Sequence, residues 1–335
     1  MLTDTLPRHT HAAPVHEPPA AIRAIGIVVV LTVVLTIVSI AFALPAARTA
    51  PHAVPIGAAG PQAASGQAAA ILDKQAPGAF AITYYPGEAA LRDAIENRDV
   101  YGGIALGPDG RSLLVATGGS PMVAQLLTQI GNGIAKQLGV PLRTEDLAPP
   151  TENDPRGVGL AASALPITLA GMLPAIALML ILKREVWTRF ATAVTFAGVA
   201  GITIATLLRY LFGAIETNFW GVAGGLTLGV LAAGLSMLGL GSLFGRVGLA
   251  LGAGLALLLG NPLSGLNSAP EMLPAGWGQL GQWLPQGANA TLLRSTAFFD
   301  GAGGALPIVV LTCWSLLGAG LVVVAAMRQR GSSAA

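Results

Sequence analysis

Six long, predominantly apolar stretches of this 335-residue chain contain no charged residue, and they limit its fold more than any other feature. Each stretch lies between two consecutive charged residues and is 19 to 29 residues long. A helix of about 20 mostly apolar residues crosses the hydrocarbon core of a bilayer. The pattern therefore predicts an α-helical polytopic membrane protein with six transmembrane helices. The bounding pairs are Arg23 and Arg48, Arg156 and Lys183, Arg189 and Arg209, Glu216 and Arg246, Arg246 and Glu271, and Asp300 and Arg328.

The composition agrees with this fold class and excludes several functions. Only 10% of the residues are charged, whereas a soluble domain has about 25%, so an ordinary water-soluble enzyme is excluded. The net charge is +2, and no basic cluster exceeds Lys183, Arg184 and Arg189. We therefore expect no nucleic-acid partner. The single cysteine, Cys313, leaves no intramolecular disulfide or cysteine-based metal site.

The first and fifth spans each leave an alternative. Ala41-Phe42-Ala43 resembles a signal-peptide cleavage site, but signal peptides have apolar cores of only about 7 to 15 residues, so 23–47 is interpreted as an uncleaved anchor. The core of the fifth span, Val247–Gly260, has 14 residues, or about 21 Å of helix. It must continue through Asn261 and Pro262 or be completed by the segment that follows. The spans are expected at about 24–47, 158–182, 190–212, 218–243, 247–262 and 305–327.

Lysine and arginine residues on short loops mark the cytoplasmic side of a membrane protein. With the N-terminus inside, the inner segments hold eight basic and three acidic residues, and the outer segments hold ten basic and thirteen acidic ones. We therefore expect a multi-pass protein of the plasma membrane with cytoplasmic tails at 1–22 and 328–335. Segments 48–156 and 263–303 are expected outside, and the core formed by spans two to six covers 157–327.

Segment 48–156 is expected to hold a small extracytoplasmic α/β domain between the first two spans. Its Pro/Ala/Gly-rich beginning, Leu44–Ala70, is interpreted as a linker. The turn GPDG indicates a hairpin, and Ser120 followed by Pro121 is typical of a helix start. The predicted order is βαββα, with strands at 79–85, 100–106 and 112–117 and helices at 88–98 and 121–138.

Several motifs for chemistry are absent from the sequence. None of the lysines, Lys74, Lys136 and Lys183, follows a glycine, so the chain has no phosphate-binding loop and is not its own ATPase. The interiors of the spans hold no aspartate, glutamate, lysine, arginine or histidine, which disfavours an ion-coupled antiporter or a membrane-embedded enzyme. We therefore expect no catalytic residue, no metal and no cofactor in this chain. The histidines lie in the expected tail and linker, at His9, His11, His16 and His52.

The outer stretch 263–303 has the most specific pattern in the chain. Ser268-Ala269-Pro270-Glu271 is a capping box and predicts a helix with an apolar stripe. Leu284-Pro285-Gln286-Gly287 breaks this helix, and a second short helix is expected to end at Asp300-Gly301. Two amphipathic half-helices are typical of an element that enters the outer leaflet, although a plain interfacial lid is the alternative. The stripe comprises Leu273, Trp277, Leu280 and Leu284, and the second helix carries Leu292, Leu293 and Phe299.

Glycines form small faces in the fourth and fifth spans. Gly221, Gly225 and Gly229 repeat at four-residue spacing, as do Gly248 and Gly252. Such faces let helices approach each other closely. Packing within the chain is the favoured interpretation, and a dimer seam is the alternative.

Three segments of the sequence resemble a known family. These are LRDAIENRDVYGGIALGPDG, the SPMVAQLL that follows it, and the late run NPLSGLNSAPEMLPAGWGQLGQWLPQGANATLLRSTAFFDGAG. They are similar to actinobacterial permeases of the ABC-2 type transporter superfamily and to the phage-infection-protein (YhgE/Pip) group. A charged turn after the second span and a broken helix pair before the sixth are also similar. The resemblance covers roughly residues 20 to 330, and the late run is its most specific part.

The resemblance implies a permease subunit that exports a substrate as a homo- or heterodimer, while ATP and Mg are bound by a separate ATPase chain. It implies that the turn between spans two and three docks on the ATPase, although the same charges could merely enforce topology. The expected coupling residues are Lys183, Arg184, Glu185, Val186, Trp187, Thr188 and Arg189.

The resemblance also implies that the outer half-helices close the translocation path. The chain departs from the exporter pattern because no amphipathic helix precedes the first span. This leaves an alternative function, a non-transporting scaffold, receptor or secretion accessory whose outer domain binds a partner. The expected gate residues are Pro262, Gly265, Glu271, Leu273, Pro274, Trp277, Trp283, Pro285, Gly287, Arg294 and Asp300.

Overall fold

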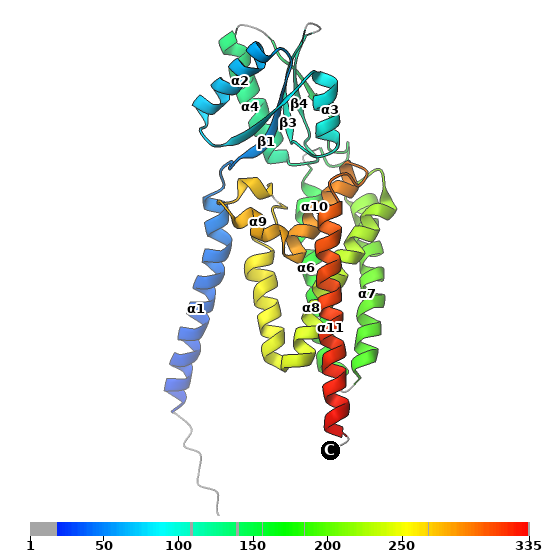
Figure 1. Ribbon diagram of the computed structural model, residues 1–335. Coiled ribbons are helices and arrows are strands. Elements are labelled where there is room, and N and C mark those ends of the chain that lie inside the picture. The colour runs from blue at the N-terminus through cyan, green and yellow to red at the C-terminus, as the bar shows by residue number, and fades with distance from the viewer. Residues whose placement is uncertain are drawn as a thin grey trace, which may run out of the picture. The chain divides into compact units, whose positions relative to one another are not determined.

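The structure is a computed structural model that describes residues 19–107, 110–138, 141–155, 157–183, 185–266 and 268–333 (Figure 1). Most of the predicted N-terminal tail, 1–22, therefore lies outside the described residues. The chain divides into two compact units, 1–40 and 41–335. The first unit holds most of helix α1 (Ala20–Ala47), a continuous helix of 28 residues formed by a run of valine, leucine and isoleucine. All other helices and strands belong to the second unit.

Five helices are long and apolar enough to cross a membrane, so the prediction of a polytopic membrane protein is confirmed at that level. The second is formed by α5 (Val158–Ala162) with α6 (Ala164–Ile181), and the third by α7 (Val186–Thr206) with the π-helical turn η1 (Leu207–Leu211). The last is α11 (Ala305–Ser333). The five candidate spans are Ala20–Ala47, Val158–Ile181, Val186–Leu211, Phe219–Gly260 and Ala305–Gly331.

The fourth and fifth expected spans lie in one element, α8 (Phe219–Gly254) with the π-helical turn η2 (Leu255–Gly260). Gly245 interrupts the helix with φ 61° and ψ −135°, a conformation that favours glycine. The chain reverses there. As a result Gly248 lies so close to the carbonyl of Leu240 that an added Cβ would overlap it. Figure 1 shows the two arms as a hairpin at the end of the bundle away from the sheet. The second arm is short, as its apolar run indicates, and six complete crossings stay a prediction.

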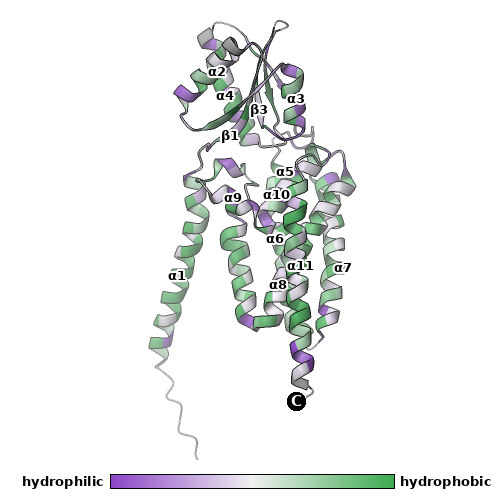
Figure 2. Ribbon diagram, viewed as in Figure 1, coloured by the Kyte–Doolittle hydropathy of each residue, from purple (hydrophilic) through white to green (hydrophobic). Residues whose placement is uncertain are grey.

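The bundle is organised around α8, which packs against α6, α7, α10 (Pro285–Phe298) and α11. Its apolar residues form the shared core, and Leu226 and Leu238 are completely buried. Leu238 belongs to a cluster with Val186 of α7 and Val322 of α11. The outer surfaces of the helices remain apolar (Figure 2), as expected of helices whose solvent is lipid.

A five-stranded mixed sheet forms a small domain, which we call the sheet domain (54–146). Its strand order is β2-β1-β3-β4-β5; β1 is parallel to β2 and β3, β3 is antiparallel to β4, and β4 is parallel to β5. Helices α2 and α4 pack on one face of the sheet, and α3 on the other (Figure 1). The elements are β1 (Val54–Ala59), α2 (Gln62–Gln75), β2 (Phe80–Tyr85), α3 (Glu88–Glu96), β3 (Gly102–Gly107), β4 (Gly110–Val115), α4 (Pro121–Leu138) and β5 (Arg143–Asp146).

The prediction of a linker over Leu44–Ala70 is wrong, because this stretch contains β1 and the first part of α2. The sequence of β1, VPIGAA, lies between two other strands and is covered on both faces, so it has no polar alternation. Gly57 suits this crowded position, since an added Cβ would overlap Leu91 of α3. The other predicted elements of the domain correspond to β2, α3, β3, β4 and α4 within a few residues.

Candidate functional site

The segment after η2 does not form the single helix expected from the capping box. It consists of a 3-10 turn, η3 (Pro270–Met272), a short helix α9 (Trp277–Gln282), and α10. Ser268 does not cap the first turn, because no side chain caps it and the Ser268 hydroxyl donates to the carbonyl of Ala269. Gly276, with φ 81°, redirects the chain before α9. The predicted stripe is therefore divided: Leu273 is buried, whereas Leu280 is half exposed.

The second predicted half-helix is α10, and it is a structural element of the bundle. Leu292 and Leu293 are buried at 2% and 1% exposure. Arg294 beside them is 6% exposed, and its guanidinium donates to the carbonyls of Gly265 at 3.1 Å and Leu266 at 2.6 Å. Burial lowers the pKa of Arg294 to about 10, because a low-dielectric surrounding disfavours the charged form. Arg294 thus fastens the loop 263–266 to α10.

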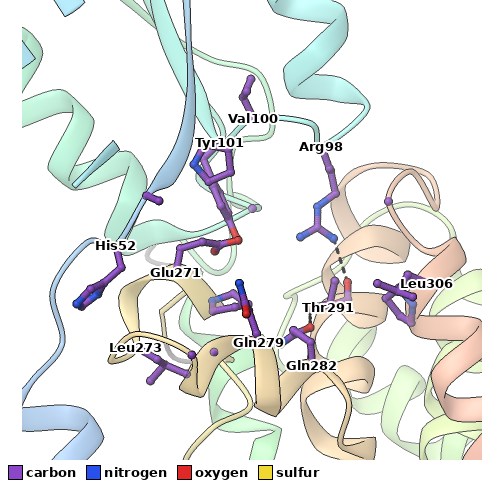
Figure 3. A pocket seen from close by; sticks show the side chains of 18 of the residues that line it. His52, Arg98, Val100, Tyr101, Glu271, Leu273, Gln279, Gln282, Thr291 and Leu306 are labelled. Atoms are coloured by element: carbon purple, nitrogen blue, oxygen red, sulfur yellow. Dashed lines mark hydrogen bonds between the residues drawn. The ribbon is translucent and has the colours of Figure 1, made fainter. Parts of the chain in front are cut away.

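A cavity of about 680 Å³ lies between the sheet domain and the segment that contains η3 and α9. This volume is typical of sites for small ligands. Figure 3 shows that side chains from both parts surround it. Its polar lining comprises His52, Arg98, Tyr101, Glu271, Gln279, Gln282 and Thr291, and its apolar lining includes Leu273, Trp283, Phe299, Leu306, Pro307 and Val310.

Arg98 enters the cavity from an unusual backbone position at the end of α3. Its φ is 64°, in the left-handed region that normally favours glycine. The amide of Arg98 donates to the carbonyl of Ile95 at 3.0 Å, and that of Asp99 to the carbonyl of Ala94 at 2.8 Å. This is the Schellman arrangement that ends a helix, with Arg98 in the place of the usual glycine. A non-glycine residue there is strained, so the contacts of its side chain must compensate for the strain.

The guanidinium of Arg98 connects the sheet domain to α10. Its Nη1 donates to the carbonyl of Thr291 at 3.0 Å and to the hydroxyl of Ser295. The group also lies 5.2 Å from the centre of the Phe299 ring, a cation–π contact. Burial lowers the pKa of Arg98, although the neighbouring Tyr101 and Glu271 partly offset this. Within the described residues, no acceptor reaches its Nε or Nη2.

Tyr101 and Glu271 form a second connection across the cavity. The Tyr101 hydroxyl donates to Oε2 of Glu271 at 2.8 Å. Burial, followed by the charge of Glu271, raises the pKa of Tyr101 well above its ordinary value, so the phenol remains a proton donor. The backbone adds to this connection, because the amide of His52 donates to the carbonyl of Glu271 at 2.9 Å.

Tight contacts next to the cavity hold the sheet domain on the bundle. The Ser120 hydroxyl is fully buried, accepts from the amide of Val123 at 3.3 Å and donates to the carbonyl of Ser268 at 2.7 Å. Ser120 is therefore the predicted N-cap of α4 and also a bridge to the late loop. A Cβ on Gly118 would overlap the ring of Phe298. The sheet domain and α10 are thus packed without space for an added methyl group.

The apolar side of the cavity begins where the candidate span α11 begins. Leu306 is 58% exposed and Val310 is 4% exposed, and both lie in the first two turns of that helix. Trp283, at the end of α9, is 62% exposed, and its carbonyl accepts from Nε1 of Trp314 at 2.8 Å. The cavity therefore joins a polar interior to an exposed apolar surface.

The predicted gate residues fall into three groups. Glu271, Leu273, Pro274 and Trp283 line the cavity. Pro285 and Gly287 are buried in the first turn of α10, and Arg294 is buried farther along it. The others surround these elements: Pro262 and Gly265 in the preceding loop, Trp277 at 38% exposure in α9, and exposed Asp300 after α10.

The predicted coupling turn joins α6 to α7 at the end of the bundle away from the sheet domain (Figure 1). Arg184 lies outside the described residues. Lys183, Glu185, Trp187 and Thr188 are exposed, and the indole of Trp187 is 50% exposed. Val186 is buried at 5%, and Arg189 at 1% with its guanidinium against the sulfur of Met179. The turn therefore exposes four of these residues, while Val186 and Arg189 belong to the helix packing.

The glycine faces lie against other parts of the same chain. A Cβ on Gly225 would contact Leu292, and one on Gly229 would overlap Asn289, so both face α10. Gly248 and Gly252 face the first arm of α8, whereas Gly221 faces the side chain of Asn218, which caps α8.

Sequence reasoning missed the sheet-domain half of the cavity. Arg98 and Tyr101 stand in an ordinary helix–strand connection, and nothing in their spacing relates them to residues about 170 to 200 positions later. One usable signal exists for Arg98, because it follows a predicted helix at a position where glycine is usual. For the glutamines and Thr291 the sequence contains no comparable signal.

Comparison with protein-family models, curated proteins and solved structures finds no match for this chain. Among the described residues, no group of three histidine, cysteine, aspartate or glutamate side chains is arranged to hold a metal ion. Functional inference therefore rests on the two ends of the bundle and on the cavity.

Proposed function

We propose that this chain is the membrane-embedded permease subunit of an ABC-2 type exporter, which moves a substrate outward with ATP hydrolysed by a separate ATPase subunit. The observation that carries the proposal is the short turn between α6 and α7. Around the start of α7 this turn exposes four side chains at one end of the bundle: Lys183, Glu185, Trp187 and Thr188. An exposed tryptophan among charges is typical of residues at which partner proteins bind.

The proposed topology has six spans and both termini in the cytoplasm of a plasma-membrane protein. In it, the two arms of α8 on either side of Gly245 are the fourth and fifth spans. The short second arm leads into the loop 263–266, whose residues are buried, which supports this reading because irregular backbone at membrane depth requires protein cover. The sheet domain is then extracytoplasmic, and Arg246 at the hairpin tip is cytoplasmic, as the positive-inside rule favours.

In this proposal the opposite end of the bundle is the outer gate. The sheet domain, η3, α9 and α10 meet there through Arg98, Tyr101 and Ser120. A dimer of permease chains would complete the path, because one set of spans has no internal duplication.

Copurification tests the proposal. The tagged full chain is purified from its native membrane in mild detergent, and its partners and vanadate-sensitive ATPase activity are measured. We expect an ATPase with Walker motifs to copurify, and the triple variant Lys183→Ala, Glu185→Ala, Trp187→Ala to lose it. Arg189 is left unchanged because it is buried. The matched control, Arg328→Ala with Arg330→Ala, changes two exposed charges in the final helix and retains the ATPase.

A second candidate function is a non-transporting receptor or scaffold that binds a partner through the sheet domain. It is supported by the cavity of about 680 Å³ against that domain. Purification of the protein with secretion components or alone, without ATPase activity, would favour this function over export. Deletion of the gene without any change in export would support the same conclusion.

A further inference from the structure

Beside the cavity between the sheet domain and α9, positively charged side chains outnumber negatively charged ones. Arg294, which is buried, and Arg98, which is partly buried, share one neighbouring carboxylate, Glu271. In the described part of the chain, neither arginine forms an ion pair with an acidic side chain. Buried cations are normally paired or hydrogen-bonded, and Arg98 uses only one of its nitrogens in the hydrogen bonds described above. Its remaining donors are the strongest candidates for a ligand.

Strain at Arg98 agrees with this role. The residue keeps a left-handed backbone with φ 64° at a helix end, where glycine would be unstrained. Such strain is frequent at binding sites and points to a function for the side chain. A guanidinium fork with free Nε and Nη2 donors matches the two oxygens of a phosphate or carboxylate.

Glu271 determines a second property of the ligand. One of its carboxylate oxygens accepts from Tyr101, and no described residue donates to the other. A ligand that places an anionic group on Arg98 and a hydroxyl on Glu271 would satisfy both side chains. Gln279 and Gln282 lie on the same wall of the cavity (Figure 3). Gln279 supplies a further donor and acceptor, whereas the amide of Gln282 already accepts from Thr291 and donates to the carbonyl of Ser264.

The apolar side of the cavity indicates the chemistry of the rest of the ligand. Next to the polar wall the cavity is lined by Trp283 at the end of the short helix α9 and by Leu306 and Val310 at the start of α11. The exposed apolar surface of a candidate span begins there. Trp283 lies beside this span, and exposed tryptophan is typical of the level of the lipid head groups. A ligand with an apolar chain can therefore enter from the bilayer and leave its head group in the polar part.

We infer that this cavity binds an anionic amphiphile, with its phosphate or carboxylate on Arg98, a head-group hydroxyl on Glu271, and its apolar chain along Trp283 and Leu306. The volume of about 680 Å³ accommodates the head group and the first part of a chain. The inference goes beyond the proposed export function and does not depend on it, because binding can be measured without any ATPase.

The test is a binding titration by native mass spectrometry on the full-length protein in detergent. Three probes separate the sources of the chemistry: dioctanoyl phosphatidylglycerol, dioctanoyl phosphatidylcholine, and glycerol phosphate, which has the head group alone. We expect phosphatidylglycerol to bind at least about tenfold more tightly than the other two, because only it has the anionic group, the hydroxyls and the chains.

Variants locate the site. Arg98→Ala should weaken phosphatidylglycerol binding at least about tenfold, as expected for a lost charge-assisted hydrogen bond, and Arg98→Lys should restore part of it. Ala275→Phe keeps Arg98 and fills the cavity from an exposed position on its wall, so it should also abolish binding. The matched control is Arg92→Ala on α3, whose guanidinium pairs with Glu145 at 2.7 Å and should leave binding unchanged.

Each other result overturns the inference. Equal binding of glycerol phosphate would show a site for a free anion, and equal binding of phosphatidylcholine would show nonspecific lipid adhesion. Phosphatidylglycerol binding that is unchanged in both Arg98→Ala and Ala275→Phe would place the lipid elsewhere. A loss in Arg98→Ala together with normal binding in Ala275→Phe would show that the lipid does not occupy this cavity.

Discussion

At the end of the bundle next to the sheet domain, charged and polar side chains are partly or fully buried and hydrogen-bonded, whereas at the far end they are exposed. Arg98, Tyr101 and Arg294 all donate to atoms of another segment. At the far end, Lys183, Glu185 and Trp187 are exposed. The difference shows two environments for polar groups in one protein: at the first end they connect segments of the chain, and at the second they remain exposed.

One charged residue at the far end, Arg189, is an exception because it is buried. Arg189, at 1% exposure, is as buried as Arg294 at the other end, yet its Nε has no hydrogen-bond partner among the described residues. Its neighbour Trp187, two residues earlier, is exposed. Helix periodicity explains this, because residues two positions apart on a helix point in different directions.

The largest expected effect is at the contact between Gly118 and Phe298. Gly118→Val should reduce the free energy of unfolding by about 3 kcal/mol, because overpacking at a closed contact forces neighbours to move. Gly133→Val in α4 is the matched control, since a Cβ there meets nothing within 4 Å. Chemical unfolding of the detergent-solubilised full chain gives the stability, and hydrogen exchange at 116–120 locates the change. Equal effects of the two variants would show that the sheet domain is not packed tightly on α10.

The next effect concerns Arg98. Arg98→Ala should cost about 2 kcal/mol through the lost hydrogen bonds to Thr291 and Ser295. Arg98→Gly removes the same bonds and relieves the strained backbone, so it should be more stable than Arg98→Ala by about 1 kcal/mol. Unfolding curves of the two variants measure this difference. If the alanine variant is the more stable of the two, the helix end is not strained.

A smaller effect is expected from Tyr101→Phe, about 1 kcal/mol at neutral pH, because Glu271 loses a donor. The variant should also change the pH dependence. The raised pKa of Tyr101 means that the unfolded chain ionises this tyrosine before the folded protein does. The folded state of the wild type should therefore lose up to about 1.4 kcal/mol per pH unit above pH 10.

Stability curves of wild type and Tyr101→Phe between pH 8 and pH 11 test the titration. In the variant the loss above about pH 10 should be smaller by the contribution of this one group. Parallel curves for the two proteins would show that Tyr101 is not buried against Glu271 in solution.

The smallest effect on stability is expected at the far end. Trp187→Ala should change the free energy of unfolding by less than about 0.5 kcal/mol, because an exposed side chain contributes little to folding, and yet it should weaken ATPase copurification. Arg189→Ala is the informative comparison, since its side chain is buried and its removal should lower stability by more than that amount. Thermal unfolding and copurification are measured on the same preparations. A large stability loss in Trp187→Ala would remove the distinction between the two ends.

Much of the helical part could be predicted from the sequence, because crossing a bilayer imposes a simple requirement on length and charge. The apolar stretches correspond to α1, α6 with α5, α7, α8 and α11. Even the short fifth stretch was recognisable as incomplete, and Gly245 accounts for its relation to the fourth. The sheet domain was harder, because β1 is covered on both faces and its proline and glycines are typical of a linker.

The cavity illustrates the limit of sequence reasoning. Glu271 was selected as a helix-capping residue, but its carboxylate accepts from Tyr101 instead, because the loop before α9 breaks the expected helix. Arg294 was expected at a gate and is a buried fastening of loop 263–266. A local pattern describes which hydrogen bonds a residue can make with its neighbours, and a residue of another segment can offer a better one.

The sequence by itself determined that the chain needs an apolar solvent, where its long helices begin and end to within a few residues, and that one of its turns is charged. These properties depend on residues close together in the chain. Only the tertiary structure decided which charges are buried, that β1 is a central strand, and that Arg98, Tyr101 and Glu271 meet around one cavity. Those outcomes depend on contacts between segments up to about 200 residues apart, and such contacts leave no periodic signal in a single sequence.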